Sequence, residues 1–122
     1  MAAGKYSFSL EQGVTLSRLI QWLDSTGTPI PLTGYTARMQ IRSTIESDTV
    51  ILSITSTYSE NGVLTIAEAT GKILIYIPAS VTATFTSHRM VYDLEIVNTD
   101  TGEVIRLLEG KIKLSEEVTR WV

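Results

Sequence analysis

The sequence predicts an all-β protein, and three observations carry that prediction. Thr, Val and Ile together make up 39 of the 122 residues, and β-branched side chains suit a pleated, half-buried surface better than a helix. Alternation of apolar and polar residues recurs along the chain, most clearly over residues 35–42. Turn-forming residues separate these runs at short intervals. The pattern is typical of a β-sandwich or a closed barrel, and we favour the sandwich because the strands are short and their connections uneven.

About eight strands follow from the alternation, and one short helical turn interrupts them. We expect the strands over residues 6–11, 14–23, 35–42, 50–55, 63–66, 72–77, 90–97 and 103–114. The third strand has the clearest faces, with Tyr35, Ala37, Met39 and Ile41 on the inner side. In the second strand, Arg18 interrupts the face of Val14, Leu16, Ile20 and Trp22, while Leu19 and Leu23 lie on the other face.

Turn signals define the connections between these strands. Residues 98–102 are rich in turn formers and predict a hairpin loop, and residues 24–29 and 59–62 have the same character. Asn61-Gly62 favours the positive backbone angles of a tight turn. Gly13 suggests a bend, and Gly110 suggests a strand bulge or a place where another backbone approaches closely. Residues 79–85 predict a single helical turn that closes one end of the sandwich with Phe85.

Length and composition describe one domain over residues 1–122, with a short N-terminal arm over 1–5 and a tail over 115–122. The absence of cysteine excludes disulfides, thiolate nucleophiles and zinc ribbons, and the single histidine, His88, cannot form an imidazole cluster. A net charge of −3 argues against nucleic acid as a partner. No apolar stretch is long enough to span a membrane. We expect a protein that is made in the cytoplasm.

The sequence offers little chemistry. Asp93 and Glu95 are two apart on one strand and share a face, which would place their carboxyl groups about 6–7 Å apart. That spacing suits a glycosidase pair or a cation site, but a polar outer strand face is the simpler interpretation. No nucleophile elbow or glycine-rich phosphate loop is present. We therefore predict no catalytic residues, no metal, no cofactor and no small-molecule substrate.

Candidate partner-binding residues lie on outer strand faces and in the tail. Arg38, Arg42 and Arg106 would project outward, where their guanidinium groups could pair with carboxylates of a neighbouring chain. In the tail, an aromatic residue near a polar terminus either folds back onto the body or anchors a partner, and both possibilities stay open. The tail candidates are Glu117, Arg120, Trp121 and Val122.

Four segments carry a resemblance to a known family. They are residues 27–42 (GTPIPLTGYTARMQIR), 10–13 (LEQG) with a strand ending at Trp22, 91–96 (VYDLEI) and 106–110 (RLLEG). Their order and spacing are similar to those of small β-sandwich domains in tailed-phage virion proteins, of the type found at the N-terminus of the baseplate upper protein. The resemblance extends from about Tyr6 to Arg120.

The resemblance implies an immunoglobulin-like, antiparallel β-sandwich that acts without enzymatic activity as an attachment and assembly module in a virion. Because the chain ends at Val122, soon after the sandwich, we expect a connector rather than a host-receptor protein. Its partners would be other virion proteins in a homo-oligomer or symmetric assembly, with contacts at the N-terminal arm, the tail, Arg38 and Arg42. A tail, baseplate or adaptor subunit is the first hypothesis, and a capsid decoration protein is the second. A carbohydrate-binding module is a third, although only Tyr58 and Trp121 offer exposed aromatic rings.

Overall fold

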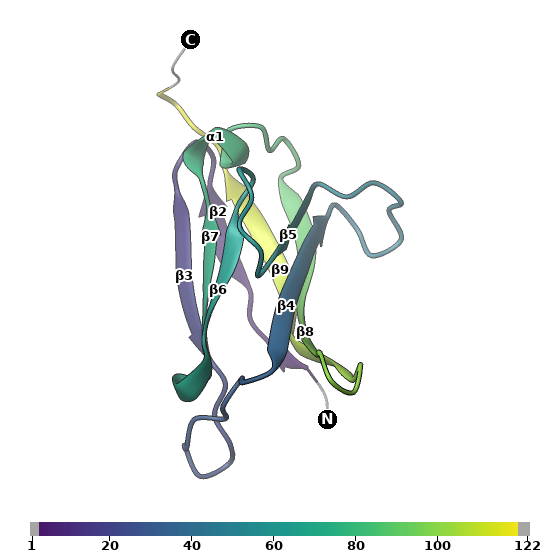
Figure 1. Cartoon of the computed structure of the whole chain (residues 1–122). Helices are drawn as coiled ribbons and strands as arrows, with labels where there is room; N and C mark the ends of the chain where they lie inside the picture. The colour runs from purple at the N-terminus through teal and green to yellow at the C-terminus, as the bar shows by residue number, and fades with distance from the viewer. Residues whose placement is uncertain (1–2, 120–122) are drawn as a thin grey trace.

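The computed structural model describes residues 3–119 and consists of two β-sheets packed face to face (Figure 1). The elements are β1 (Gly4–Lys5), β2 (Phe8–Glu11), β3 (Leu16–Gln21), β4 (Tyr35–Arg42), β5 (Leu52–Thr55), β6 (Val63–Ala67), η1 (Glu68–Thr70), β7 (Lys72–Ile77), α1 (Ala79–Thr82), β8 (Arg89–Asn98) and β9 (Val104–Ser115). The expected strands and the short helical turn are therefore all present. No helix within residues 3–119 is both long and apolar enough to cross a bilayer.

The strand order is that of an immunoglobulin-like sandwich, which confirms the expected fold class. Sheet A has the order β1-β9-β8-β4-β5, with β2 also paired to β9, and sheet B has the order β3-β7-β6. In immunoglobulin terms, sheet B corresponds to strands B, E and D, and β4, β8 and β9 correspond to strands C, F and G. The first strand lies beside β9 at the edge of sheet A.

The N-terminal strand differs from the expected antiparallel arrangement. Both β1 and β2 pair with β9 in a parallel direction, so Gly4 and Lys5 belong to the sheet and not to a free arm. Between the two segments the chain passes so close to Gly110 that a Cβ atom there would overlap the carbonyl oxygen of Tyr6. The backbone N–H of Lys111 then donates to Ser7 Oγ at 3.0 Å. Gly110 is thus the close-approach site that the sequence suggested.

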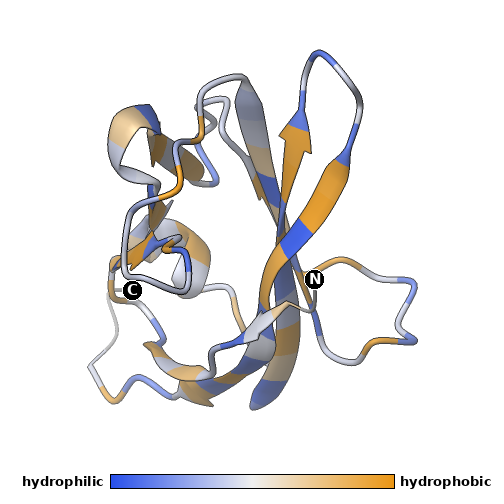
Figure 2. Cartoon of the chain, turned by 90° about the horizontal axis from the view of Figure 1, so that it is seen from below, coloured by the Kyte–Doolittle hydropathy of each residue, from blue (hydrophilic) through white to orange (hydrophobic). Residues whose placement is uncertain are grey.

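The core fills the space between the sheets and follows from strand alternation, which Figure 2 shows as alternating hydrophobic and hydrophilic bands. From β8, the side chains of Tyr92, Leu94 and Ile96 are buried as predicted. After α1 the chain turns inward, and Phe85 is only 2% exposed. The buried Thr82 hydroxyl donates to the carbonyl oxygen of Val14 at 2.9 Å, which ties α1 to the start of β3.

Two of the three predicted hairpin loops connect different sheets. The loop over 98–102 joins β8 to β9 as expected. The loop over 24–29 instead leads from sheet B to sheet A, and the loop over 59–62 leads from sheet A to sheet B. Each contains only an isolated bridge, Leu23 with Pro29 and Ser59 with Gly62. The turn at Asn61-Gly62 is not the expected type, which needs a positive φ at both residues. Gly62 has a φ of 140°, but Asn61 does not have a positive φ.

Candidate binding surfaces

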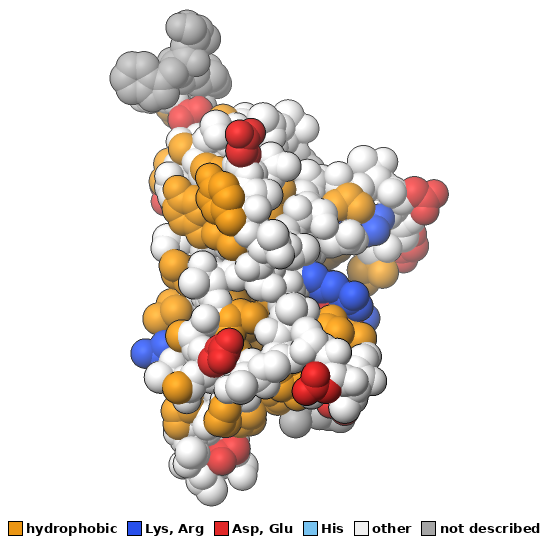
Figure 3. All heavy atoms as spheres, in the orientation of Figure 1, with side chains coloured by type: hydrophobic (Ala, Val, Ile, Leu, Met, Phe, Trp, Pro, Cys, Tyr) orange, Lys and Arg blue, Asp and Glu red, His pale blue; other side chains and the backbone are white. Residues whose placement is uncertain are grey.

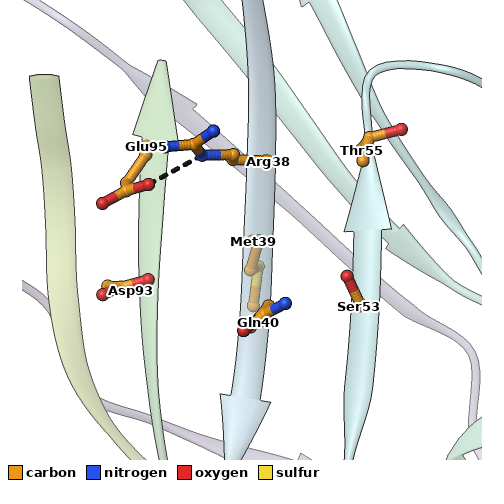
Figure 4. Close-up of a pocket in the computed structure, with 7 residues that line it drawn as sticks. All are labelled: Arg38, Met39, Gln40, Ser53, Thr55, Asp93 and Glu95. Carbon is orange, nitrogen blue, oxygen red and sulfur yellow. Dashed lines mark hydrogen bonds and ion pairs between the residues drawn. The ribbon is translucent and has the colours of Figure 1, made fainter. Parts of the chain in front are cut away.

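The outer face of sheet A is charged, and the half nearer the β8–β9 hairpin is neutralised by ion pairs. The Nε of Arg38 lies 2.7 Å from Glu95 Oε1, and Figure 4 shows the arginine reaching from β4 toward β8. Asp93 faces Arg106 at 3.5 Å, and Lys5 pairs with Glu109 at 2.7 Å. Arg38 projects outward as predicted, but its carboxylate partner belongs to its own chain.

Asp93 and Glu95 share this outer face, as their spacing predicted. Burial raises the pKa of the Asp93 carboxyl group, the negative charge of Glu95 raises it further, and Arg106 acts in the opposite direction. The hollow beside them, about 350 Å³, has a polar lining that includes Gln40, Ser53 and Thr55 (Figure 4). Residues 3–119 contain no cluster of three or more potential metal ligands. Each carboxylate lies beside an arginine, an arrangement that matches the expected polar strand face.

The other half of the same face, toward α1, carries four cations that we call the basic band: Arg42, Arg89, Lys111 and Lys113. Arg89 lies directly opposite Lys113, while Arg42 and Lys111 flank Val91 on either side. The guanidinium group of Arg42 donates to Ser47 O at 2.6 Å and to Gln40 Oε1 at 3.0 Å. The sequence identified only Arg42 as a candidate. The other three cations lie on β8 and β9, and only the pairing of these strands with β4 brings them beside Arg42.

The outer face of sheet B is largely uncharged and carries apolar side chains on all three strands, together with the polar residues Ser17, Gln21 and Thr65. Its central rows place Leu19 beside Leu74 and Tyr76 beside Val63, and we call these four residues the apolar face. The side chain of Leu19 is 60% exposed and that of Tyr76 is 38% exposed. Figure 3 shows hydrophobic side chains on the side of the molecule that these strands form. The sequence did offer one signal for this surface, because Leu19 was placed on the outer side of its strand. It was not interpreted as part of an exposed apolar face.

An apolar hollow of about 540 Å³ adjoins the apolar face. It lies between the edge strands β1 and β3, where the two sheets separate. Its apolar lining consists of Tyr6, Leu19, Ile20, Trp22, Leu23, Leu107 and Leu108. Leu19 belongs both to the lining of the hollow and to the apolar face, so the two surfaces are continuous.

The start of the tail is tied to the body at Glu117, whereas Val118 is 91% exposed. The backbone N–H of Glu117 donates to Gln12 Oε1 at 2.9 Å, and the amide group of Gln12 donates to Phe85 O at 2.8 Å. The Glu117 carboxylate covers Gly13. The remaining tail candidates, Arg120, Trp121 and Val122, lie outside the described residues. Tyr58 is 76% exposed, as expected.

No protein-family model matches the chain, and a comparison with curated proteins gave no match.

Proposed function

We propose that this chain is a non-enzymatic structural and assembly component of a tailed-phage virion: a tail, baseplate or adaptor subunit that binds neighbouring virion proteins. The observation that carries the proposal is the apolar face of sheet B together with the adjoining hollow. The virion setting is supported by the resemblance of residues 27–42, 91–96 and 106–110 to small virion sandwich domains.

The apolar face suits protein attachment because it departs from the usual solvated face of an antiparallel sheet. Such a face normally alternates to polar residues on the side away from the core. Here Leu19, Leu74 and Tyr76 lie on adjacent strands, and Lys72 is the charged residue among the described positions of the face. Continuous exposed apolar surface is a mark of interaction sites, and the cores of interfaces are depleted in charge.

The architecture also suits long-lived attachment. Most of the sandwich is built from extensive strand pairing, including the ten-residue β8 and the twelve-residue β9. Such a body presents its outer faces and free strand edges in fixed positions. Neighbouring chains can pack on the faces or extend an edge by main-chain hydrogen bonds. Those properties serve a part repeated around a symmetric particle.

The variant Leu19→Lys tests the proposal. The side chain is already 60% exposed, so the free energy of unfolding should change by no more than about 0.5 kcal/mol. A lysine in the centre of an apolar contact would be desolvated, so we expect the variant to be depleted from purified particles when it replaces the wild-type chain. Quantitative mass spectrometry of the particles measures this incorporation.

Tyr58→Lys is the matched control, because Tyr58 is similarly exposed but lies outside the apolar face. We expect this variant to be incorporated at the wild-type level. Wild-type protein absent from purified particles would overturn the virion role. Leu19→Lys incorporated as well as the control would overturn the assignment of the apolar face.

A further inference from the structure

The basic band places like charges next to one another. Like charges directly opposite each other in an antiparallel pair destabilise a sheet, and Arg89 faces Lys113 in this way. No ion pair joins any of the four cations to a carboxylate within residues 3–119. On the other half of the same face, cations and carboxylates are interleaved. A chain with 13 acidic residues has thus kept four of its ten Lys and Arg side chains together on one surface.

The band also has a shape that can receive a ligand. The loop after β4 brings Ile45, which is 81% exposed, to the edge of a hollow of about 520 Å³. Arg42, Val91 and Lys111 contribute to the lining of this hollow. Val91 therefore has a cation on either side, while Asp93 and Glu109 line another part of the same hollow, where they pair with Arg106 and Lys5. Glu46 and Asp48 on the same loop are exposed and form no ion pair with the band in the described structure.

The opposite end of the same molecule carries the complementary chemistry. The β8–β9 hairpin presents Asp100 and Glu103, both exposed, beside Val104, which is 46% exposed. The hairpin is held in shape by Asn98, whose Oδ1 accepts the backbone N–H groups of Asp100 at 2.9 Å and Thr101 at 3.2 Å. It therefore offers two carboxylates and an apolar side chain without a large ordering cost.

Neighbouring loops add acidic charge at this end. Thr99 N–H and its hydroxyl both donate to Gly34 O, at 2.9 and 3.0 Å, which ties the hairpin to the chain before β4. The backbone N–H of Leu32 donates to Glu68 O at 2.8 Å, which brings in η1. Asp24 and Glu68 thereby belong to the same end of the sandwich, with Lys72 as the nearby cation.

We propose that copies of this chain associate head to tail, with the β8–β9 hairpin of one copy docked on the basic band of the next. The contact is heterologous, so each copy uses two different surfaces, and repetition gives a ring or an open filament. The inference deepens the assembly role proposed above by naming one partner, and it rests on that role. Self-association of purified protein and incorporation into particles are separate measurements, so the two proposals can fail separately.

The test is sedimentation velocity of the purified full chain as a function of protein and salt concentration. We expect association at about 0.1 M salt, where the screening length is roughly 10 Å, and its loss at about 1 M, where it is roughly 3 Å. The double variant Lys111→Glu/Lys113→Glu should weaken association by roughly tenfold or more. The carboxylate at position 113 would face Arg89 and replace a pair of like charges with a pair of opposite charges, so the variant should remain folded.

A second double variant, Asp100→Asn/Glu103→Gln, removes the two carboxylates from the other half of the contact and should weaken association to a similar degree. Mixing the two variants distinguishes a head-to-tail contact from a symmetric one. The band variant keeps its hairpin and the hairpin variant keeps its band, so an equimolar mixture should form dimers and nothing larger. Lys72→Glu, which removes a cation from the acidic end and not from the band, is the control and should associate at least as strongly as the wild type.

Three results would overturn the inference. One is a wild-type chain that stays monomeric up to about 1 mM, the weak end of specific association. Another is a mixture of the two double variants that contains only monomers while the wild type associates. The third is a band that binds nucleic acid or an acidic peptide from another protein while copies of the chain do not bind one another.

Discussion

At the scale of single residues, Tyr92 links the first strand to the centre of sheet A. Its ring lies within the core, 4% exposed, against Phe8 at a centroid distance of 5.5 Å. Its hydroxyl donates to the carbonyl oxygen of Tyr6 at 2.6 Å, where the chain passes between β1 and β2. Burial raises the pKa of the Tyr92 hydroxyl, and Tyr6 raises it further. A single side chain thus supplies packing and the hydrogen bond at the break in the N-terminal strand.

Tyr92→Phe should lower the free energy of unfolding by about 1–2 kcal/mol, because a part-buried carbonyl loses its hydrogen-bond donor while the ring packing stays. Urea denaturation measures the change. Tyr58→Phe, at a largely exposed position, should cost no more than about 0.5 kcal/mol. Equal effects of the two substitutions would show that the Tyr6 carbonyl does not depend on this bond.

The same hydroxyl predicts a pH dependence. Because folding raises its pKa above the ordinary value near 10, the protonated hydroxyl stabilises the fold at lower pH. That contribution should decline as the pH rises above about 10. The wild type should therefore lose stability in this range faster than Tyr92→Phe does. Parallel curves for the two proteins in alkaline denaturation would contradict the prediction.

At the scale of elements, β8 places two carboxylates side by side with unlike surroundings. Asp93 has a side-chain exposure of 39% and an ion pair at 3.5 Å, whereas Glu95 has an exposure of 23% and a pair at 2.7 Å. Folding raises the pKa of Asp93, chiefly through burial. The ionised form of Asp93 is therefore less favourable in the folded chain than in the unfolded chain.

Asp93→Asn should increase the free energy of unfolding at pH 7, by less than about 1 kcal/mol because solvent screens a partly exposed group. The sign follows from the raised pKa: the protonated carboxyl stabilises the fold at low pH, and that stability is lost as the pH rises. The advantage of the variant should thus disappear in acid. Unfolding curves at pH 3 and pH 7 measure it, and a variant less stable than the wild type at pH 7 would contradict the prediction.

Glu95→Gln is the contrasting substitution on the same face. It removes the short ion pair with Arg38, so it should lower the free energy of unfolding at pH 7 by up to about 1 kcal/mol. The two substitutions should therefore change the free energy of unfolding in opposite directions. An increase for Asp93→Asn reports the cost of a buried charge, and a decrease for Glu95→Gln reports the loss of an ion pair.

Local alternation was enough to predict the strands, because side-chain period and turn residues are properties of short segments. It predicted β7 over residues 72–77 and the inner face of β8. Pairing partners were not predictable in this way, so the parallel N-terminal strand and the crossing at 24–29 were missed. The same reason applies to the surfaces. Alternation indicates that Arg38 points outward, but its position beside Glu95 depends on the register between β4 and β8. In the same way, the four cations of the basic band come together only when β4, β8 and β9 pair.

At the scale of the whole molecule, the sandwich has two unlike outer faces. Sheet A presents paired charges and a basic band, whereas sheet B presents an apolar face beside an apolar hollow. In the proposed assembly, sheet B attaches the chain to a different virion protein, and the two ends of sheet A connect successive copies. One small domain would then supply both the attachment and the repetition that a symmetric particle requires.

An image reconstruction of the virus particle in which we propose that this chain assembles is the most direct test of the assembly role. The account predicts density for the sandwich in several symmetry-related copies, with Leu19 and Tyr76 of each copy buried against a neighbouring virion protein. Particles that lack the chain, or that expose the outer face of sheet B to solvent in every copy, would contradict it.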